Sequence, residues 1–189
     1  MAEAIHITTP LTLDKVKSLK AGDSVLISGI IYAARDAAHK KMVEALERGE
    51  KLPVDFTDQV IYYVGPSPAK PGNPIGSAGP TTSGRMDRYT PAMIEQGLRG
   101  MIGKGYRSKE VVDAMKKHGV TYFAAIGGAA ALIARTIKKY DVLAYGDLGP
   151  EALAALTVED FPAIVVIDCE GNNFYEQGQK LYAQPAVMA

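Results

Sequence analysis

Short apolar runs rich in β-branched residues recur along the chain, and segments with apolar residues at helical spacing separate them. The longest run, 24–33 (SVLISGIIYA), is typical of a core strand. In the segment that follows, Ala38, Met42 and Ala45 repeat at helical spacing, and Gly49 stands where a helix would stop. By the same signals we expect strands at 5–8, 24–33, 60–64, 99–104, 120–126, 141–145 and 161–168. We expect helices at 14–20, 36–48, 90–97 and 108–118, and another from Gly127-Gly128 through 136 or 138.

The end of the chain departs from this alternation. A turn at Glu170-Gly171-Asn172 follows the strand at 161–168 and predicts a closing hairpin with a strand at 173–176. Strands that alternate with helices and then end in a hairpin favour an α/β fold with a mixed sheet flanked by helices. We expect a single domain over 1–189.

The segment 65–84 breaks the periodicity altogether. It holds four prolines before Gly79 and no pattern of regular structure. Long irregular segments inside a compact domain are uncommon and tend to be functional, with disorder as the alternative. A functional loop is therefore expected here.

Composition narrows the class of protein. Lys+Arg and Asp+Glu both number 21, so the net charge is zero and binding to nucleic acid through bulk charge is disfavoured. The lone cysteine, Cys169, excludes an internal disulfide and a self-contained thiolate metal site, so no metal is expected on this chain itself. With no signal peptide or membrane span apparent, a cytoplasmic protein is expected.

Two arginines stand where a predicted strand meets a loop or helix. Arg35 follows the apolar run 24–33, and Asp36 begins the next helix with His39 one turn further on. A guanidinium presents a planar fork of donors that matches a carboxylate edge. Arg35 therefore reads as a ligand-facing cation held by Asp36 or by packing, against the alternative of a surface Arg–Asp pair. His39 either faces the same site or binds local polar groups.

The second arginine, Arg85, lies in the string GPTTSGRMD at 79–87. There Thr81, Thr82 and Ser83 stand between glycines, which allow close approach of the backbone to an anion; an ordinary polar turn is the alternative. Lys104 lies between Gly103 and Gly105 and either reaches an anionic ligand or is a flexible surface lysine. Together these residues indicate a site for a small dicarboxylate.

A turn of small residues at 126–131 (IGGAAA) offers a helix N-terminus to an anion, or simply packs closely. It lacks the full glycine spacing of a dinucleotide site, so a nucleotide-binding α/β protein is poorly supported.

In five strings the chain resembles the β subunit of iron–sulfur-dependent class I fumarases and L-tartrate dehydratases. The strings are GIIYAARDAAH at 29–39, GPTTSGRMD at 79–87, GKG at 103–105, IGGAA at 126–130 and DFPAIVVIDCEGN at 160–172. They occur in the family's order over nearly the whole chain, and Cys169 is the one departure. The resemblance implies a swivelling β/β/α domain that closes over a [4Fe-4S] cluster carried by a cysteine-bearing α subunit.

The resemblance also implies a reaction and roles for the residues. Water would be removed reversibly from a 2-hydroxy dicarboxylate, most simply malate to fumarate or tartrate to oxaloacetate, with the hydroxyl on an open iron of the cluster. Residues that match the family's motifs would bind the carboxylates (Arg35, Arg85, Lys104), take the carbon-bound proton (Thr81) and support these groups (Asp36, His39, Thr82, Ser83, Asp87). Among the supporting residues, Asp87 is a candidate to hold Arg85. A non-enzymatic carboxylate-binding or regulatory module using the same arginines is the alternative, and the isolated chain could form a homodimer.

Overall fold

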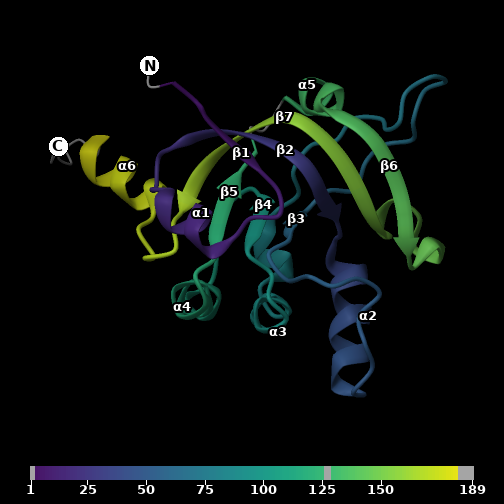
Figure 1. Ribbon diagram of the computed structural model, residues 1–189, viewed down its shortest axis with the longest axis horizontal. Coiled ribbons are helices and arrows are strands. Elements are labelled where there is room, and N and C mark those ends of the chain that lie inside the picture. The colour runs from purple at the N-terminus through teal and green to yellow at the C-terminus, as the bar shows by residue number, and fades with distance from the viewer. Residues whose placement is uncertain (1–2, 126–128, 183–189) are drawn as a thin grey trace, which may run out of the picture.

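Seven strands make one mixed sheet in the computed structural model, which describes residues 3–125 and 129–182. The strand order is β1-β2-β3-β4-β5-β7-β6, and an additional pairing of β2 with β7 closes five of these strands into a barrel-like ring (Figure 1). The strands are β1 (Ile5–Thr8), β2 (Ser24–Ala33), β3 (Val60–Tyr62), β4 (Gly100–Gly103), β5 (Thr121–Ala124), β6 (Ile137–Ala144) and β7 (Leu153–Ile167).

Strand direction divides the sheet into two parts. Strands β1 to β5 pair in parallel with their neighbours, whereas β7 runs antiparallel to β2, β5 and β6. The ring closes because β7 is long: its residues 154–164 pair with β2 and its residues 164–167 pair with β5. The carboxyl ends of β2 to β5 consequently face the same end of the sheet.

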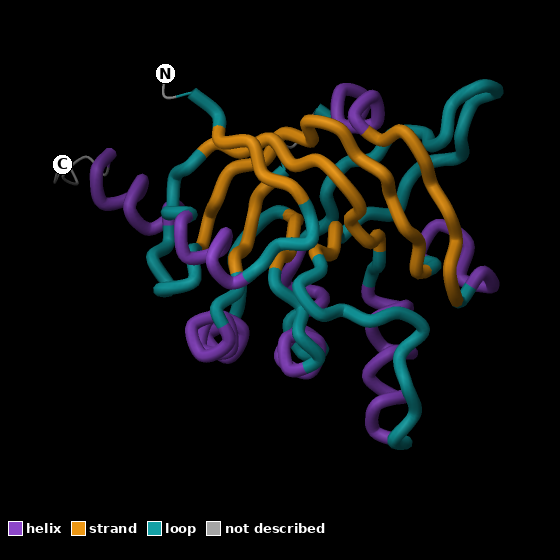
Figure 2. The backbone as a smooth tube through the Cα atoms, viewed as in Figure 1, coloured by secondary structure: helices purple, strands orange, loops and turns teal. Residues whose placement is uncertain are grey.

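The connections between the parallel strands are helical. The α-helices are α1 (Leu13–Ser18), α2 (Asp36–Glu47), α3 (Thr90–Glu95), α4 (Lys109–His118), α5 (Ala130–Thr136) and α6 (Phe174–Tyr182), and the 3-10 helices are η1 (Ser83–Met86) and η2 (Gly146–Glu151). Helices α2, α3 and α4 lie on one side of the sheet (Figure 2). Successive crossovers between parallel strands share one hand, so they place their helices on the same side. Among the described residues, no helix has the length and apolar character that crossing a membrane requires.

Alternation along the strands separates two apolar clusters. In the third strand and the residues just after it, Val60, Tyr62 and Val64 join one cluster, whereas Ile61 and Tyr63 join the other. The first cluster also includes residues from the ring strands β2, β4, β5 and β7 and from α1 and α5, and the second includes residues from α2, α3 and α4. Both faces of the central strands are therefore buried, which is why their sequences are almost continuously apolar.

The sequence predicts most elements near their observed places, but the closing hairpin is wrong. Residues 173–176, expected as a strand, contribute one isolated bridge at Asn173, and helix α6 follows from Phe174. The Asn173 side chain accepts a hydrogen bond from the amide of Tyr175 at 3.0 Å, which is how a residue ahead of a helix satisfies its unpaired amides. The antiparallel pair of consecutive strands is instead β6 with β7. Both strands begin earlier than the sequence predicts, at Ile137 and Leu153.

The irregular segment after β3 is a loop, as expected. It forms no regular structure before η1 and is closed on itself by Ser67, which bonds to the backbone of Gly76 and Ser77. The buried hydroxyl of Tyr62 donates to the carbonyl of Ala78 at 2.5 Å. This second anchor holds the end of the loop that leads into the string GPTTSGRMD.

Candidate active site

The candidate residues converge at the carboxyl ends of the parallel strands. Arg35 follows β2, the loop with the hydroxyls returns beside the end of β3, and Lys104 follows β4. Crevices beyond the carboxyl ends of parallel strands are where α/β folds bind ligands.

Arg35 lies at the start of α2 with only 19% of its side chain exposed. Its Nη2 is 3.3 Å from Oε1 of Glu151, and its Nε is 3.7 Å from Oδ1 of Asp36. The chain passes so close that a Cβ added at Gly65 would lie 2.6 Å from Arg35 Nη1. Packing and carboxylates together therefore orient the guanidinium, as the sequence predicts for Asp36.

Asp36 also holds the second arginine. Nη2 of Arg85 donates to Asp36 Oδ2 at 2.9 Å, and the Arg85 side chain is 52% exposed. A single carboxylate thus lies between Arg35 and Arg85. It brings together two cations that are far apart in the sequence.

Asp87 does not hold Arg85, and that expectation is wrong. Its Oδ1 accepts from Nε of Arg107 at 2.7 Å, and its Oδ2 accepts from the amide of Ser108 at 2.6 Å. The chain from Arg85 to Asp87 is helical, and side chains two residues apart on a helix do not face each other. Arg85 therefore points to solvent while Asp87 points inward.

The three hydroxyls of the loop have different surroundings. Ser83 is buried: its Oγ accepts from the amide of Lys104 at 3.1 Å and lies 2.9 Å from the hydroxyl of Tyr122. Thr82 is exposed and forms a backbone bridge with Lys104. Thr81 is half-buried and is held by its backbone amide, which donates to the carbonyl of Tyr63 at 2.8 Å, so its hydroxyl is not used in that contact.

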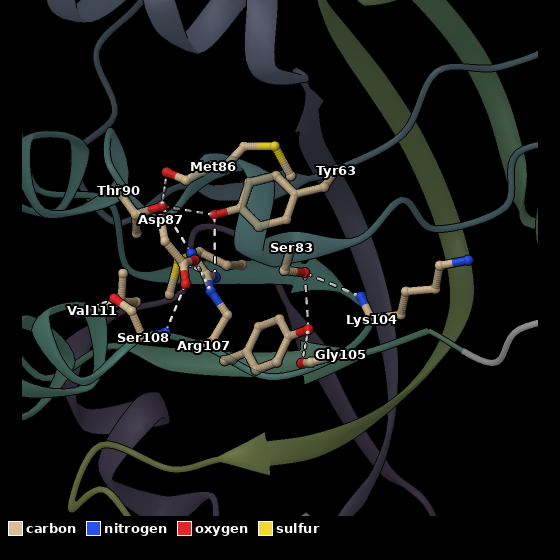
Figure 3. A network of polar contacts seen from close by, with 12 residues as sticks. Tyr63, Ser83, Met86, Asp87, Thr90, Lys104, Gly105, Arg107, Ser108 and Val111 are labelled. Atoms are coloured by element: carbon tan, nitrogen blue, oxygen red, sulfur yellow. Dashed lines mark hydrogen bonds and ion pairs between the residues drawn. The ribbon is translucent and has the colours of Figure 1, made fainter.

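Lys104 lies next to this loop because β4 ends there. Its amide and carbonyl both bond to Ser83, and its exposed side chain extends away from those contacts (Figure 3). Gly103 is required for this approach, since a Cβ there would lie 2.0 Å from Ser83 Oγ. The lysine is thus placed by its backbone, and its side chain is exposed to solvent.

His39 is fully buried, and its ring packs edge-on against the ring of Tyr63, with the two centroids 5.4 Å apart. Its Nδ1 must carry the proton, because it lies 2.8 Å from the carbonyl of Arg35, and a carbonyl only accepts. Its Nε2 has no hydrogen-bond partner among the residues that the structure describes. The structure thus shows a contact with a local polar group, which is one of the two alternatives that the sequence leaves open. Burial, with a smaller effect of Arg107, lowers the pKa of His39 to about 4.

This histidine should make stability depend on pH. Between the ordinary pKa of 6.5 and the folded value of about 4, the unfolded chain binds more protons than the folded one. The free energy of unfolding should therefore fall as the pH drops through this window, by about 3 kcal/mol in total. Urea denaturation at several pH values measures the slope. His39→Gln should flatten it, whereas the exposed control His6→Gln should leave it unchanged; an equal slope in wild type and His39→Gln would refute the assignment.

Two residues at the site, Glu151 and Arg107, are not among those that the sequence predicts. Glu151, at the end of η2, reaches Arg35 and also accepts from the amide of Ala37 at 3.4 Å. Arg107 is buried and holds Asp87. Nothing in the sequence links Glu151 to Arg35. Arg107 could have been suspected, because it lies two residues after the GKG turn at 103–105.

The residues of this chain do not fit an iron–sulfur cluster. The sequence has one cysteine, Cys169, and the described residues contain no group of three or more side chains that could hold a metal ion. The small-residue turn with Gly127-Gly128 falls partly outside the described residues.

Comparisons with known proteins agree on one family. A family model described as "Fumarase C-terminus" matches residues 1–178. The chain is 41% identical over 182 residues to "Fumarate hydratase class I, aerobic" of Salmonella typhimurium, covering 94% of this chain and 31% of that protein. It is 43% identical over 176 residues to "Putative L(+)-tartrate dehydratase subunit beta" of Methanocaldococcus jannaschii, covering 90% of both. "Fumarate hydratase 2" of Leishmania major is 43% identical over 180 residues, with 32% of that protein covered. The chain thus spans about a third of the fumarate hydratases and nearly all of the tartrate dehydratase subunit.

Proposed function

Because the chain belongs to the fumarase C-terminus family, we propose that it is the β subunit of a hydro-lyase that removes water reversibly from a 2-hydroxy dicarboxylate. Malate giving fumarate is the first candidate reaction, and tartrate giving oxaloacetate is the second. In this proposal the chain acts as one swivelling domain that supplies the cations for the substrate and the group that takes its proton.

The observation that carries the proposal is the shared carboxylate of Asp36. Arg35 Nε lies 3.7 Å from one of its oxygens and Arg85 Nη2 lies 2.9 Å from the other, so one carboxylate stands between two guanidinium groups at the carboxyl ends of the strands. Lys104 adds a third cation from the next strand. Two substrate carboxylates removed from water need about this much positive charge.

Among the loop hydroxyls, Thr81 is the best candidate for the group that takes the carbon-bound proton. Ser83 is committed, because its oxygen accepts from Lys104 and its proton points to Tyr122, whose own hydroxyl donates to the carbonyl of Gly105 at 3.0 Å. Thr82 is exposed. A threonine hydroxyl is a weak base in water, so nearby cations have to stabilise its alkoxide.

In this proposal Arg35, Arg85 and Lys104 bind the two carboxylates and orient the substrate. Thr81, in its alkoxide form, then takes the proton from the carbon next to one carboxylate and becomes the neutral hydroxyl, and the electron pair of the broken C–H bond stays on that carbon. Negative charge then builds on that carboxylate, and the cation bound to it stabilises this charge. The stabilisation raises the rate because the contact is stronger in the transition state than in the bound substrate. The group that assists departure of the hydroxyl is assigned to the partner subunit.

The partner would be a cysteine-bearing α subunit that holds a [4Fe-4S] cluster. With Cys169 alone, this chain lacks the thiolates that such a cluster requires. The fumarate hydratases it matches are about three times as long as the matched region. In this proposal, a separate subunit supplies what the remainder of those proteins contains.

The isolated chain should therefore be inactive. Anaerobic incubation of the chain with iron and sulfide should give no stable cluster and no fumarate hydration, because one thiolate cannot anchor it. Absorbance at 240 nm follows fumarate, and iron is counted after gel filtration. Stable cluster assembly with turnover by this chain alone would contradict the proposal.

The positive test is assembly with the cysteine-bearing subunit. The complex, purified anaerobically, is assayed on fumarate, malate, tartrate and a methylated analogue. Turnover of one of them identifies the substrate. Carboxylate binding without turnover in a complex that holds its cluster would instead favour a non-enzymatic binding module.

A further inference from the structure

The guanidinium of Arg107 is buried beneath the candidate site, in the segment between β4 and α4. Besides its contact with Asp87, Nη2 donates to Oγ1 of Thr90 at 2.8 Å, and Nη1 lies 3.4 Å from the hydroxyl of Tyr63 (Figure 3). The guanidinium carbon also lies 5.3 and 5.1 Å from the ring centroids of Tyr63 and Tyr122. The guanidinium therefore forms hydrogen bonds or polar contacts along its edge and packs near two aromatic rings.

These contacts fasten the segment that carries Arg85. Asp87 lies two residues after Arg85, and Thr90 donates to the carbonyl of Met86 at 2.9 Å. Arg107 holds both Asp87 and Thr90. The far end of η1 is therefore fixed to the connection between β4 and α4.

The near end of η1 is fixed by a second chain of contacts, which runs from Arg107 through Tyr122 to Ser83. Tyr122, whose ring lies against the Arg107 guanidinium, bonds through its hydroxyl to Ser83, and Ser83 bonds to the amide of Lys104. Ser83 precedes Arg85 by two residues and follows Thr81 by two. Arg85 thus stands between two buried anchors that meet at one guanidinium.

We propose that Arg107 is a positioning residue that fixes Arg85 and Thr81 relative to Lys104. It does not contact substrate; it acts through Asp87 on one side and Tyr122 and Ser83 on the other. The inference rests on the proposed function, because it assigns Arg85, Thr81 and Lys104 to one substrate.

Because the charge of Arg107 is buried, its contacts favour one particular arrangement of the surrounding residues, in addition to stabilising the fold. An unpaired charge in the interior is costly, so the guanidinium is satisfied only when Asp87 and Thr90 are both in place. Lysine has one point charge and cannot form this fork. Arg107→Lys should therefore keep the charge and lose the geometry.

The test uses the assembled enzyme with its partner subunit. Arg107→Lys should lower kcat/KM by roughly 10- to 100-fold, since a small misplacement of reacting groups is enough for such a loss. It should also raise KM and increase the deuterium isotope effect on kcat/KM with C3-deuterated malate, because the C–H step slows. A variant that merely lowers the folded fraction would reduce kcat and leave KM and the isotope effect unchanged.

Asp87→Asn alters the contact between Arg107 and Asp87 without changing Arg107 itself. It therefore also tests the inference if Arg107→Lys does not fold. It should raise KM and the isotope effect in the same way, and the double variant should lose less than the product of the two single losses. Arg88→Lys, at an exposed neighbouring arginine, is the matched control and should retain wild-type kinetics. Wild-type kcat/KM in Asp87→Asn, or losses with unchanged KM and isotope effect, would overturn the inference.

A second readout separates this inference from the proposed function. Hydrogen exchange at the amides of Ser83 and Ser108, which bond to Lys104 and Asp87, should become at least tenfold faster in either variant. If the wild-type complex has no hydro-lyase activity, the proposed function fails, and this exchange still decides whether Arg107 positions the loop. Unchanged protection of both amides would refute the positioning role.

Discussion

Thr81→Ala is expected to lower kcat of the assembled enzyme by roughly 10³-fold, within the range that a positioned proton acceptor contributes. KM should change little, because Arg35, Arg85 and Lys104 still bind the carboxylates. The structure supports this choice, since the hydrogen bond that holds Thr81 uses its backbone amide and not its hydroxyl. The direct measurement is the incorporation of deuterium from solvent into C3 of malate.

Two further variants make the result specific to the hydroxyl. Thr81→Ser keeps an oxygen at the same place and should retain measurable exchange. Thr82→Ala alters the exposed neighbour and should exchange at the wild-type rate. If Thr81→Ala also exchanges at that rate, Thr81 is not the base, and the assignment passes to the other hydroxyls.

Arg85→Lys is expected to weaken transition-state binding by about 2–4 kcal/mol in the assembled enzyme. Lysine keeps the charge but loses the fork that meets a carboxylate in two-point contact. The melting temperature should barely change, because the Arg85 side chain is half-exposed and its ion pair with Asp36 lies near solvent. Measurement of kcat/KM together with thermal unfolding separates the two effects.

Arg35→Lys should show a similar loss of kcat/KM together with lower stability. Its guanidinium is mostly buried against Gly65 and Glu151, so the fork also contributes to packing. Arg48→Lys is the matched control, because Arg48 forms a two-point contact with Glu50 at an exposed position. Full activity in either Arg35→Lys or Arg85→Lys would show that the arginine does not bind substrate.

The amino-acid sequence by itself determined the elements whose signals are local. The apolar run 24–33 is β2, and the helical spacing after Asp36 is α2. Ser108 and Gly119 bound α4 where a cap and a left-handed glycine are expected, with Ser108 accepting from the amide of Val111 and Gly119 at φ 67°. Local sequence suffices here because capping and periodicity act within a few residues.

Only the tertiary structure decided which side chains meet. Asp36 bonds to Arg85 across 49 positions of sequence, and Arg107 bonds to Asp87 across 20, although Arg85 lies much nearer to Asp87 in the chain. Helical geometry points the side chains of Arg85 and Asp87 in different directions. Because β2, β3 and β4 are parallel neighbours, the residues that follow β2 and β4 lie close enough to pair with them: Asp36 with Arg85, and Arg107 with Asp87.

The same reason explains the error at the end of the chain. Residues 153–160 carry no strong strand signal alone, yet they complete β7 because β2 and β6 offer backbone partners on both sides. Within the part of the chain that the structure describes, residues 173–176 find one isolated bridge as a backbone partner, so their local capping preference prevails and they begin α6. Pairing between distant strands is decided by which backbone groups the fold leaves unsatisfied, and no pattern within a short segment encodes that.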